Sequence, residues 1–191
     1  MKIGVLALQG NFSIHYEKIL EFGETPIYVK DKKSLFQCDG LIIPGGESTT
    51  MSLLIKELDL FDAIKKFSTT HTLFGTCAGA ILMSQCIDDD KVLNFNCINV
   101  KSIRNSWGSQ IDSFKAEISL CKDFSKRNIE GSFIRAPKFI KNDNNCKVLG
   151  RYKKEDVLIR NNNHLISSFH PELYINFSLP IYEYYLNMIN E

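Results

Sequence analysis

The sequence lacks both an excess of charge of one sign and any long hydrophobic run. Its 23 lysines and arginines almost balance its 22 aspartates and glutamates, which leaves a formal net charge of +1. Such a balance offers no electrostatic attraction for nucleic acid or for an anionic membrane surface. The apolar run at residues 3–8 is too short for a signal sequence or a membrane span. We therefore expect no nucleic-acid partner and no membrane contact.

Patterns that bind metals or phosphates are missing as well. The six cysteines are scattered with no CxxC pair, and the four histidines do not stand near them at the spacing of a metal site. This distribution fits reduced thiols in a cytoplasmic protein better than disulfides or zinc. No GK[ST] sequence follows the glycines at 45 and 46, which excludes a Walker A loop. We expect neither a metal nor a cofactor.

The composition is that of a globular protein with a substantial core, since 44% of the 191 residues are hydrophobic and 24% are charged. The length fits a single domain spanning residues 1–191. In the first half, strand-length apolar runs alternate with segments of helical periodicity. The expected strands are 2–8, 25–29, 41–43 and 72–74, and the expected helices are 14–22, 51–58 and 61–67. This alternation predicts an α/β fold, a flavodoxin-like three-layer sandwich with a mostly parallel central sheet.

The middle of the chain changes to short segments with polar breaks, which predict an antiparallel excursion from the parallel sheet. Its expected segments are 92–103, 113–120 and 132–140, followed by strands at 147–152, 156–160 and 164–169. A helix over about 179–189 is expected to close the fold. We interpret Asp88–Asp90 as a solvated loop.

Cys77 stands in the segment Gly75–Gly79, between an apolar strand and an apolar helical stretch. A strand, sharp turn and helix of this kind lift the side chain to the top of a sheet. There the helix N-terminus lowers the thiol pKa and supplies free N–H groups. A lone cysteine is more often a small buried hydrophobic residue. The flanking glycines and the strand–turn–helix context favour a nucleophile at an elbow instead.

A second segment, Phe169–Leu173, carries a histidine and a glutamate two residues apart. Residues at this spacing in an extended segment point the same way, so Glu172 is placed to orient the imidazole of His170. A histidine before a proline is often only structural. Together with the thiol, however, the segment supplies a general base and a carboxylate, and we predict a catalytic triad of Cys77, His170 and Glu172.

The loop Pro44–Thr50 falls at the carboxyl end of a predicted strand, where open parallel sheets bind their ligands. We expect the N–H groups of Gly46 and Ala78 to form an oxyanion hole beside the thiol. Glu47 and Ser48 are placed to receive the ammonium or amide group of an amino-acid substrate. A plain glycine turn followed by a helix cap explains the same residues equally well.

Arg104 ends a predicted strand, and its guanidinium suits a substrate carboxylate. A surface arginine is the simpler explanation for any single position. The compact segment Phe133–Pro137 has a backbone that can line the same pocket.

These segments together resemble the glutaminase subunit of pyridoxal 5′-phosphate synthase, a family within the class I glutamine amidotransferases. The similar segments span nearly the whole chain: GVLALQG at 4–10, GLIIPGGESTT at 40–50, GTCAG at 75–79, RN-x-x-G-x-Q at 104–110, FIRAP at 133–137 and FHPEL at 169–173. GTCAG and HPE mark the superfamily, whereas LQG, PGGESTT and IRAP are typical of this branch.

The resemblance implies that the thiol attacks the side-chain amide of L-glutamine and forms a glutamyl thioester, which water hydrolyses. It implies six substrate-contacting residues: Gly46, Glu47, Ser48, Arg104, Ile134 and Arg135. The ammonia is expected to pass to a separate synthase subunit, which builds pyridoxal 5′-phosphate within a large hetero-oligomer. Gln9 and His15 match positions of that partner interface. Partner docking is expected to reorganise the loop at Gly45 and Gly46.

Several positions depart from the pattern of this family. Ile14 precedes the histidine of the interface where a glutamate is common. Trp107 and Ser109 replace a commoner pattern that includes a basic residue, and Lys115 stands where an acidic residue is frequent. Asn161 replaces a usual glutamine. None of these positions belongs to the predicted triad.

Three other functions fit part of the sequence. One is the glutaminase of a different amidotransferase, such as imidazole glycerol phosphate synthase or an enzyme of purine or pyrimidine synthesis. Another is a non-catalytic docking protein on the same fold, and the third is a cysteine hydrolase that does not favour glutamine. The PGGESTT and IRAP segments argue against the first, and the intact Cys77, His170 and Glu172 argue against the second.

Overall fold

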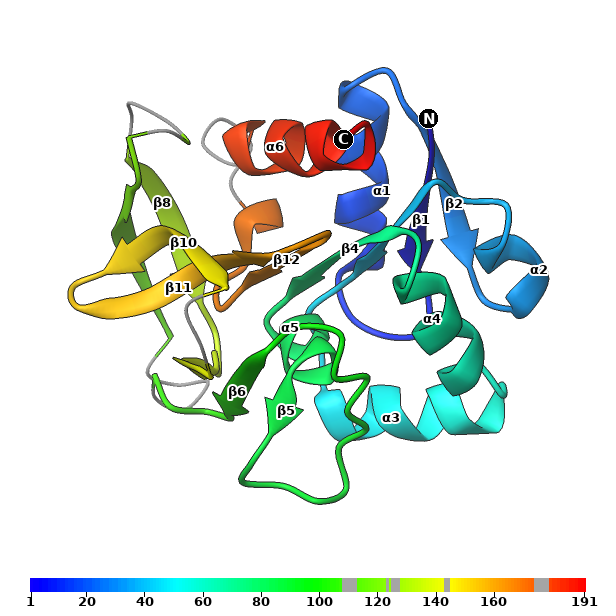
Figure 1. Ribbon diagram of the computed structural model, residues 1–191, viewed down its shortest axis with the longest axis horizontal. Coiled ribbons are helices and arrows are strands. Elements are labelled where there is room, and N and C mark those ends of the chain that lie inside the picture. The colour runs from blue at the N-terminus through cyan, green and yellow to red at the C-terminus, as the bar shows by residue number, and fades with distance from the viewer. Residues whose placement is uncertain (108–112, 123, 125–127, 143–144, 174–178) are drawn as a thin grey trace.

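The computed structural model describes residues 1–107, 113–122, 124, 128–142, 145–173 and 179–191. Its main element is a nine-stranded sheet in the order β2-β1-β3-β4-β12-β11-β10-β7-β8 (Figure 1). The strands are β1 Lys2–Leu6, β2 Thr25–Val29, β3 Gly40–Ile43, β4 Thr72–Thr76, β7 Phe114–Leu120, β8 Ile129–Phe133, β10 Cys146–Tyr152, β11 Glu155–Asn161 and β12 His164–Ser167. The five strands from β2 to β12 are parallel, and the other four continue the sheet in antiparallel pairs. The expected parallel sheet with an antiparallel excursion is therefore confirmed.

Helices cover both faces of the parallel half of the sheet. They are α1 Phe12–Glu21, α2 Lys32–Leu35, α3 Ser48–Glu57, α4 Phe61–Ser68, α5 Ala78–Met83, the 3-10 turn η1 Pro171–Leu173 and α6 Leu179–Ile189. Figure 1 shows α1 and α6 on one face, and α3, α4 and α5 on the other. A small second sheet lies beside α5, in the order β5 Gln85–Cys86, β6 Val100–Ile103 and β9 Lys138–Lys141. None of the helices in the described part of the chain combines the length and apolarity that a membrane crossing requires.

The parallel strands are apolar on both sides, and each side builds its own core. In β3, Leu41 and Ile43 pack with α3, α4 and α5, whereas Ile42 belongs to the cluster under α1 and α6. The same alternation divides Leu73 from Phe74 in β4. Because every second side chain points to the opposite face of a strand, a continuous apolar run is what a sheet buried on both faces requires. The three-layer arrangement follows from these runs.

Several predicted strands are wrong over part of their length. Of the segment 92–103 only Val100–Ile103 is a strand, because Val92, Phe95 and Ile98 reach the core from a coiled segment. Asn94 stabilises that segment by accepting the N–H of Cys86 at 2.6 Å. The segment 132–140 is divided between two sheets, β8 and β9, by a bend at 134–137. The first strand ends at Leu6 instead of residue 8.

Candidate functional site

Cys77 lies at the sharp turn between β4 and α5. Its backbone has φ +47° and ψ −104°, a conformation that L residues rarely adopt, and its N–H donates to Ser167 O at 2.8 Å. The turn is possible only with small neighbours, because a Cβ on Gly79 would lie 1.9 Å from Ile43 O. The strained turn directs the thiol to the carboxyl edge of the sheet, at the N-terminus of α5. The predicted elbow is present.

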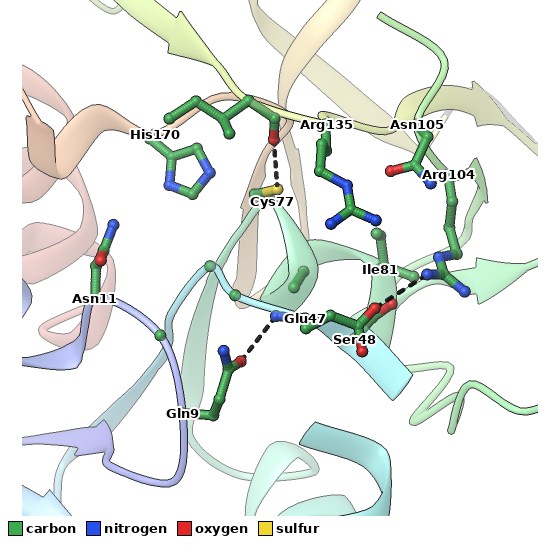
Figure 2. Close-up of a pocket in the computed structure, with 15 residues that line it drawn as sticks. Gln9, Asn11, Glu47, Ser48, Cys77, Ile81, Arg104, Asn105, Arg135 and His170 are labelled. Atoms are coloured by element: carbon green, nitrogen blue, oxygen red, sulfur yellow. Dashed lines mark hydrogen bonds and ion pairs between the residues drawn. The ribbon is translucent and has the colours of Figure 1, made fainter. Parts of the chain in front are cut away.

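Strand pairing brings the histidine segment to the same edge. β12 and β4 are parallel neighbours with Ser167 opposite Thr76, so residues that follow the two strands emerge side by side. The chain then pairs His170 with Ser132 of β8, and the His170 N–H donates to Ser132 O at 2.8 Å. This bridge fixes the histidine backbone beside the elbow. Figure 2 shows the His170 ring close to Cys77.

The buried pair His170 and Glu172 is joined by a hydrogen bond of 2.7 Å between Nδ1 and Oε1. Burial alone would lower the pKa of His170, but the charges of Glu172 and Cys77, with hydrogen bonds to both, raise it well above its usual range. Burial would raise the pKa of Glu172, but electrostatic interactions with His15 and His170, together with the hydrogen bond to His170, lower it to about 2. The pair therefore suits a base that is oriented by an ionised carboxylate.

The predicted contact between His170 and Glu172 exists, but the extended segment from which it was predicted does not. Residues 171–173 form a 3-10 turn, not an extended segment. The carboxylate folds back to the imidazole because the chain turns at Pro171, and spacing along a strand plays no part.

The glycine loop after β3 packs tightly against its surroundings. A Cβ on Gly45 would lie 2.3 Å from Cε1 of His170, and one on Gly46 would lie 2.2 Å from Oε1 of Gln9. That Gln9 oxygen accepts the N–H of Glu47 at 2.8 Å (Figure 2). Both glycines are therefore required for close approach. Ala78, on the other side of the thiol, starts a helix, where N–H groups have no intrahelical acceptor.

Glu47 has two structural partners. One oxygen accepts the Thr50 N–H at 2.9 Å and so caps α3, which confirms the helix-cap explanation of this loop. The other oxygen pairs with Nη2 of Arg104 at 3.2 Å. Partial burial would raise the pKa of Glu47, but hydrogen bonds from Thr49 and Thr50 and the charge of Arg104 lower it. The adjacent Ser48, the first residue of α3, is buried.

Arg104 is not a free surface arginine. Its guanidinium pairs with Asp89 as well as with Glu47, and its backbone N–H donates to Asp88 at 2.9 Å. Asp88–Asp90 is a loop in which Asp88 and Asp90 are exposed, as expected, but Asp89 is partly buried, and the first two aspartates hold this arginine. The run of three aspartates indicated in the sequence that a cation could bind there, and only the fold shows that this cation is Arg104.

The cavity between these segments has a volume of about 340 Å³. Every predicted catalytic and substrate-contacting residue lines it except Glu172, which lies behind His170. Ile134 contributes its backbone, because its carbonyl accepts the Cys77 thiol at 3.6 Å. Arg135, with φ +47°, is exposed, and Figure 2 shows its guanidinium in the cavity. Five lining residues were not predicted as site residues: Gly10, Asn11, Gly45, Ile81 and Asn105.

The assignment of His15 to a partner interface is wrong for its side chain. His15 has no exposed surface, and its Nδ1 lies 2.7 Å from the hydroxyl of Tyr182. A fully buried ring cannot touch a docking protein. Gln9, by contrast, is partly exposed and lines the cavity beside the glycine loop.

Two of the residues that depart from the family pattern form hydrogen bonds within the fold. Trp107 donates from its indole to Pro137 O at 2.8 Å, and Asn161 donates to Asn145 O at 3.2 Å. Lys115 lies in β7, and Ile14 in α1. Ser109, with Gly108 and Gln110 of the RN-x-x-G-x-Q segment, lies outside the described residues. Among the described residues, the six cysteines form no disulfide and no group of three metal-binding side chains occurs.

Comparison with known proteins agrees with this geometry. The sequence pattern of the SNO glutamine amidotransferase family matches residues 5–191. A protein of Thermosipho africanus named pyridoxal 5′-phosphate synthase subunit PdxT is 41% identical over 192 residues and the full length of both chains. One of the same name from Solibacter usitatus is 40% identical, over 90% of this chain and 92% of its own.

Solved structures share the fold. A crystal structure of a glutamine amidotransferase is 34% identical, covers 99% of both chains and superposes with a TM-score of 0.89. A chain in the structure of PurLQS from Thermotoga maritima is 16% identical, with a TM-score of 0.70 over 97% of this chain and 97% of its own. The second likeness concerns the fold alone.

Proposed function

This chain belongs to the SNO glutamine amidotransferase family, and we propose that Cys77, His170 and Glu172 are the catalytic triad with which it releases ammonia from L-glutamine. The chain is the glutaminase subunit of pyridoxal 5′-phosphate synthase, in line with the proteins to which it is similar over 92% and 100% of their length. One observation carries the chemistry. A strained thiol at a helix N-terminus faces the same cavity as a buried histidine that is hydrogen-bonded to an ionised glutamate.

The reaction proceeds through two steps at the thiol. His170 takes the proton of Cys77, and the thiolate attacks the side-chain amide carbon of glutamine. The N–H groups of Gly46 and Ala78 stabilise the negative oxygen of the tetrahedral intermediate. His170 then gives its proton to the leaving nitrogen, so that ammonia and a glutamyl thioester form. Water, deprotonated by His170, hydrolyses the thioester to glutamate and restores the thiol.

We assign the two charged groups of the substrate to two neighbouring sets of residues in the cavity. Glu47 and Ser48 receive the α-ammonium group, and Arg104 and Arg135 receive the α-carboxylate, with Ile134 beside them. The pairing of Arg104 with Glu47 supports this assignment, because a bound amino acid with both charges can take one partner from each side of that ion pair.

The ammonia passes to a synthase subunit in a hetero-oligomer, and we propose that residues 1–191 act as one glutaminase domain in it. Gln9 is the residue through which docking reaches the active site, because its side chain already holds the N–H of Glu47 in the glycine loop. We also propose a cytoplasmic location. Its support is that the six cysteines form no disulfide in the described part of the chain, as a reducing compartment would keep them.

The test is glutamate release from L-glutamine by the purified chain with and without its synthase subunit. Cys77→Ala should lower the rate by at least about 1000-fold, because it removes the nucleophile. Cys121→Ala, which removes a free thiol outside the cavity, is the matched control and should leave the rate unchanged. A wild-type chain that binds the synthase subunit but releases no glutamate would leave a docking protein in place of a glutaminase.

A further inference from the structure

Two buried polar side chains that have no part in the proposed reaction, His15 and Tyr182, lie next to Glu172 on the side away from His170. Glu172 binds His170 through Oε1, whereas its other oxygen, Oε2, has no hydrogen-bond partner within normal distance in the described part of the chain. The ring of His15 approaches this oxygen, and its Nε2 lies 3.6 Å from Oε2. The side chains of His15 and Glu172 are both fully buried. A buried carboxylate oxygen without a donor is costly, so this approach is not incidental.

Tyr182 determines which nitrogen of His15 carries the proton. Burial lowers the pKa of His15, opposed by the charge of Glu172, so the ring is neutral and holds one N–H. The Tyr182 hydroxyl lies 2.7 Å from Nδ1 and can donate to it. The proton then stands on Nε2, which faces the carboxylate and also lies 3.4 Å from the Thr76 hydroxyl. The other tautomer would turn a nitrogen lone pair toward an anion.

We propose that His15, held in this tautomer by Tyr182, is a positioning residue that fixes the carboxylate of Glu172 against His170. This inference rests on the proposed function, because it concerns the same triad. His170 is bound to one oxygen of the carboxylate, and the N–H of His15 faces the other at 3.6 Å, so the carboxylate cannot rotate away from the imidazole without also leaving His15. The three elements involved, α1, η1 and α6, come from both ends of the chain. The triad is thus held from behind by residues that never reach the cavity.

Two pairs of variants separate a donor from simple packing. Glutamine and methionine have nearly the same shape, but only glutamine ends in an N–H group, so His15→Gln retains a donor that His15→Met removes. Tyr182→Phe removes one hydroxyl from α6. Tyr185→Phe, on the same helix, removes another buried hydroxyl, which has no hydrogen-bond partner in the described structure.

The measurement is kcat and KM for glutamine in the complex with the synthase subunit. We expect His15→Met and Tyr182→Phe to lower kcat about 10- to 100-fold with KM within twofold, because the substrate touches neither residue. His15→Gln and Tyr185→Phe should stay close to wild type. Equal kcat values for the two His15 variants, or for the two tyrosine variants, would overturn the proposal. If His15→Met does not fold, the tyrosine pair decides.

A readout that needs no activity separates this inference from the proposed function. In the chain labelled with ¹⁵N-histidine, NMR should show the His15 ring protonated on Nε2, and Tyr182→Phe should disturb that signal. A proton on Nδ1 would overturn the positioning role even in a fully active enzyme. A wild type that is inactive with its synthase subunit, yet protonated on Nε2, would count against the proposed glutaminase and not against this arrangement.

Discussion

At the scale of single residues, the burial of His164 makes the stability of the protein depend on pH. This side chain begins β12, accepts the N–H of Leu73 at 3.3 Å, and is almost fully buried. Burial lowers its pKa from 6.5 to about 4, although hydrogen bonds to Ser68 and Asn163 oppose the shift. The pKa of His164 is lower in the folded protein than in the unfolded chain. Its burial as a neutral ring therefore contributes fully to the stability above pH 6.5, and this contribution is lost as the pH falls through 4.

The free energy of unfolding from urea titrations should therefore fall between pH 7.5 and pH 4.5. About 2 kcal/mol of that fall should disappear in His164→Gln, because a glutamine takes up no proton. His71→Gln, which removes a histidine from a partly exposed site, is the control. A fall reduced equally in both variants would contradict the assignment to His164.

The residues of the proposed triad could be picked out from the sequence, but the positioning residue proposed behind them could not. Cys77 and His170 are marked by small neighbours, a strand–turn–helix pattern and the family segments. His15 was matched to the partner interface instead, because nothing in the sequence shows that it contacts Tyr182, which lies 167 positions away along the chain. A contact between the two ends of a chain depends on the whole topology, which local pattern does not contain.

At the scale of elements, the packing of α5 against β3 depends on a single glycine. A Cβ on Gly79 would lie 1.9 Å from Ile43 O, a backbone atom that cannot move aside as a flexible side chain does. We expect Gly79→Ala to lower the free energy of unfolding by about 3 kcal/mol or more, as for severe overpacking. The same change would displace the elbow at Cys77, so glutamine turnover should fall with it.

Gly23→Ala is the control for this variant. Gly23 has φ +75°, but nothing lies within 4 Å of its added Cβ. Its cost should be limited to the backbone, about 1 kcal/mol, with turnover unchanged. Thermal and urea unfolding of both variants gives the comparison. A Gly79→Ala protein as stable as Gly23→Ala would mean that α5 shifts without penalty.

Elements with a strong periodicity were predicted better than those without one. The parallel strands and the helices α1, α3, α4 and α6 follow apolar patterns that local burial dictates. The segment 92–99 fails because its apolar residues reach the core from a coil. The four-residue helix α2 was missed because its signal is a capping box between Asp31 and Ser34, not a hydrophobic face.

At the scale of the whole molecule, the active site joins the parallel half of the sheet to the antiparallel excursion. The glycine loop and the elbow follow β3 and β4. Arg104 follows β6, and Arg135 lies between β8 and β9. A glutamine bound in this cavity would contact the loops that follow β3 and β4 and also the segments that carry Arg104 and Arg135. Ligand binding should therefore order both halves together.

Hydrogen exchange of the Cys77→Ala variant tests this bridging, because a variant without the nucleophile should bind glutamine without hydrolysing it. Saturating L-glutamine should slow exchange in 44–50 and 76–83 and also in 100–106 and 133–138, whereas D-glutamine, with the same groups in the wrong configuration, should protect much less. Protection confined to the first two segments would mean that the excursion does not hold the substrate. The carboxylate would then need another partner than Arg104 and Arg135, the two arginines that line the cavity in the described part of the chain.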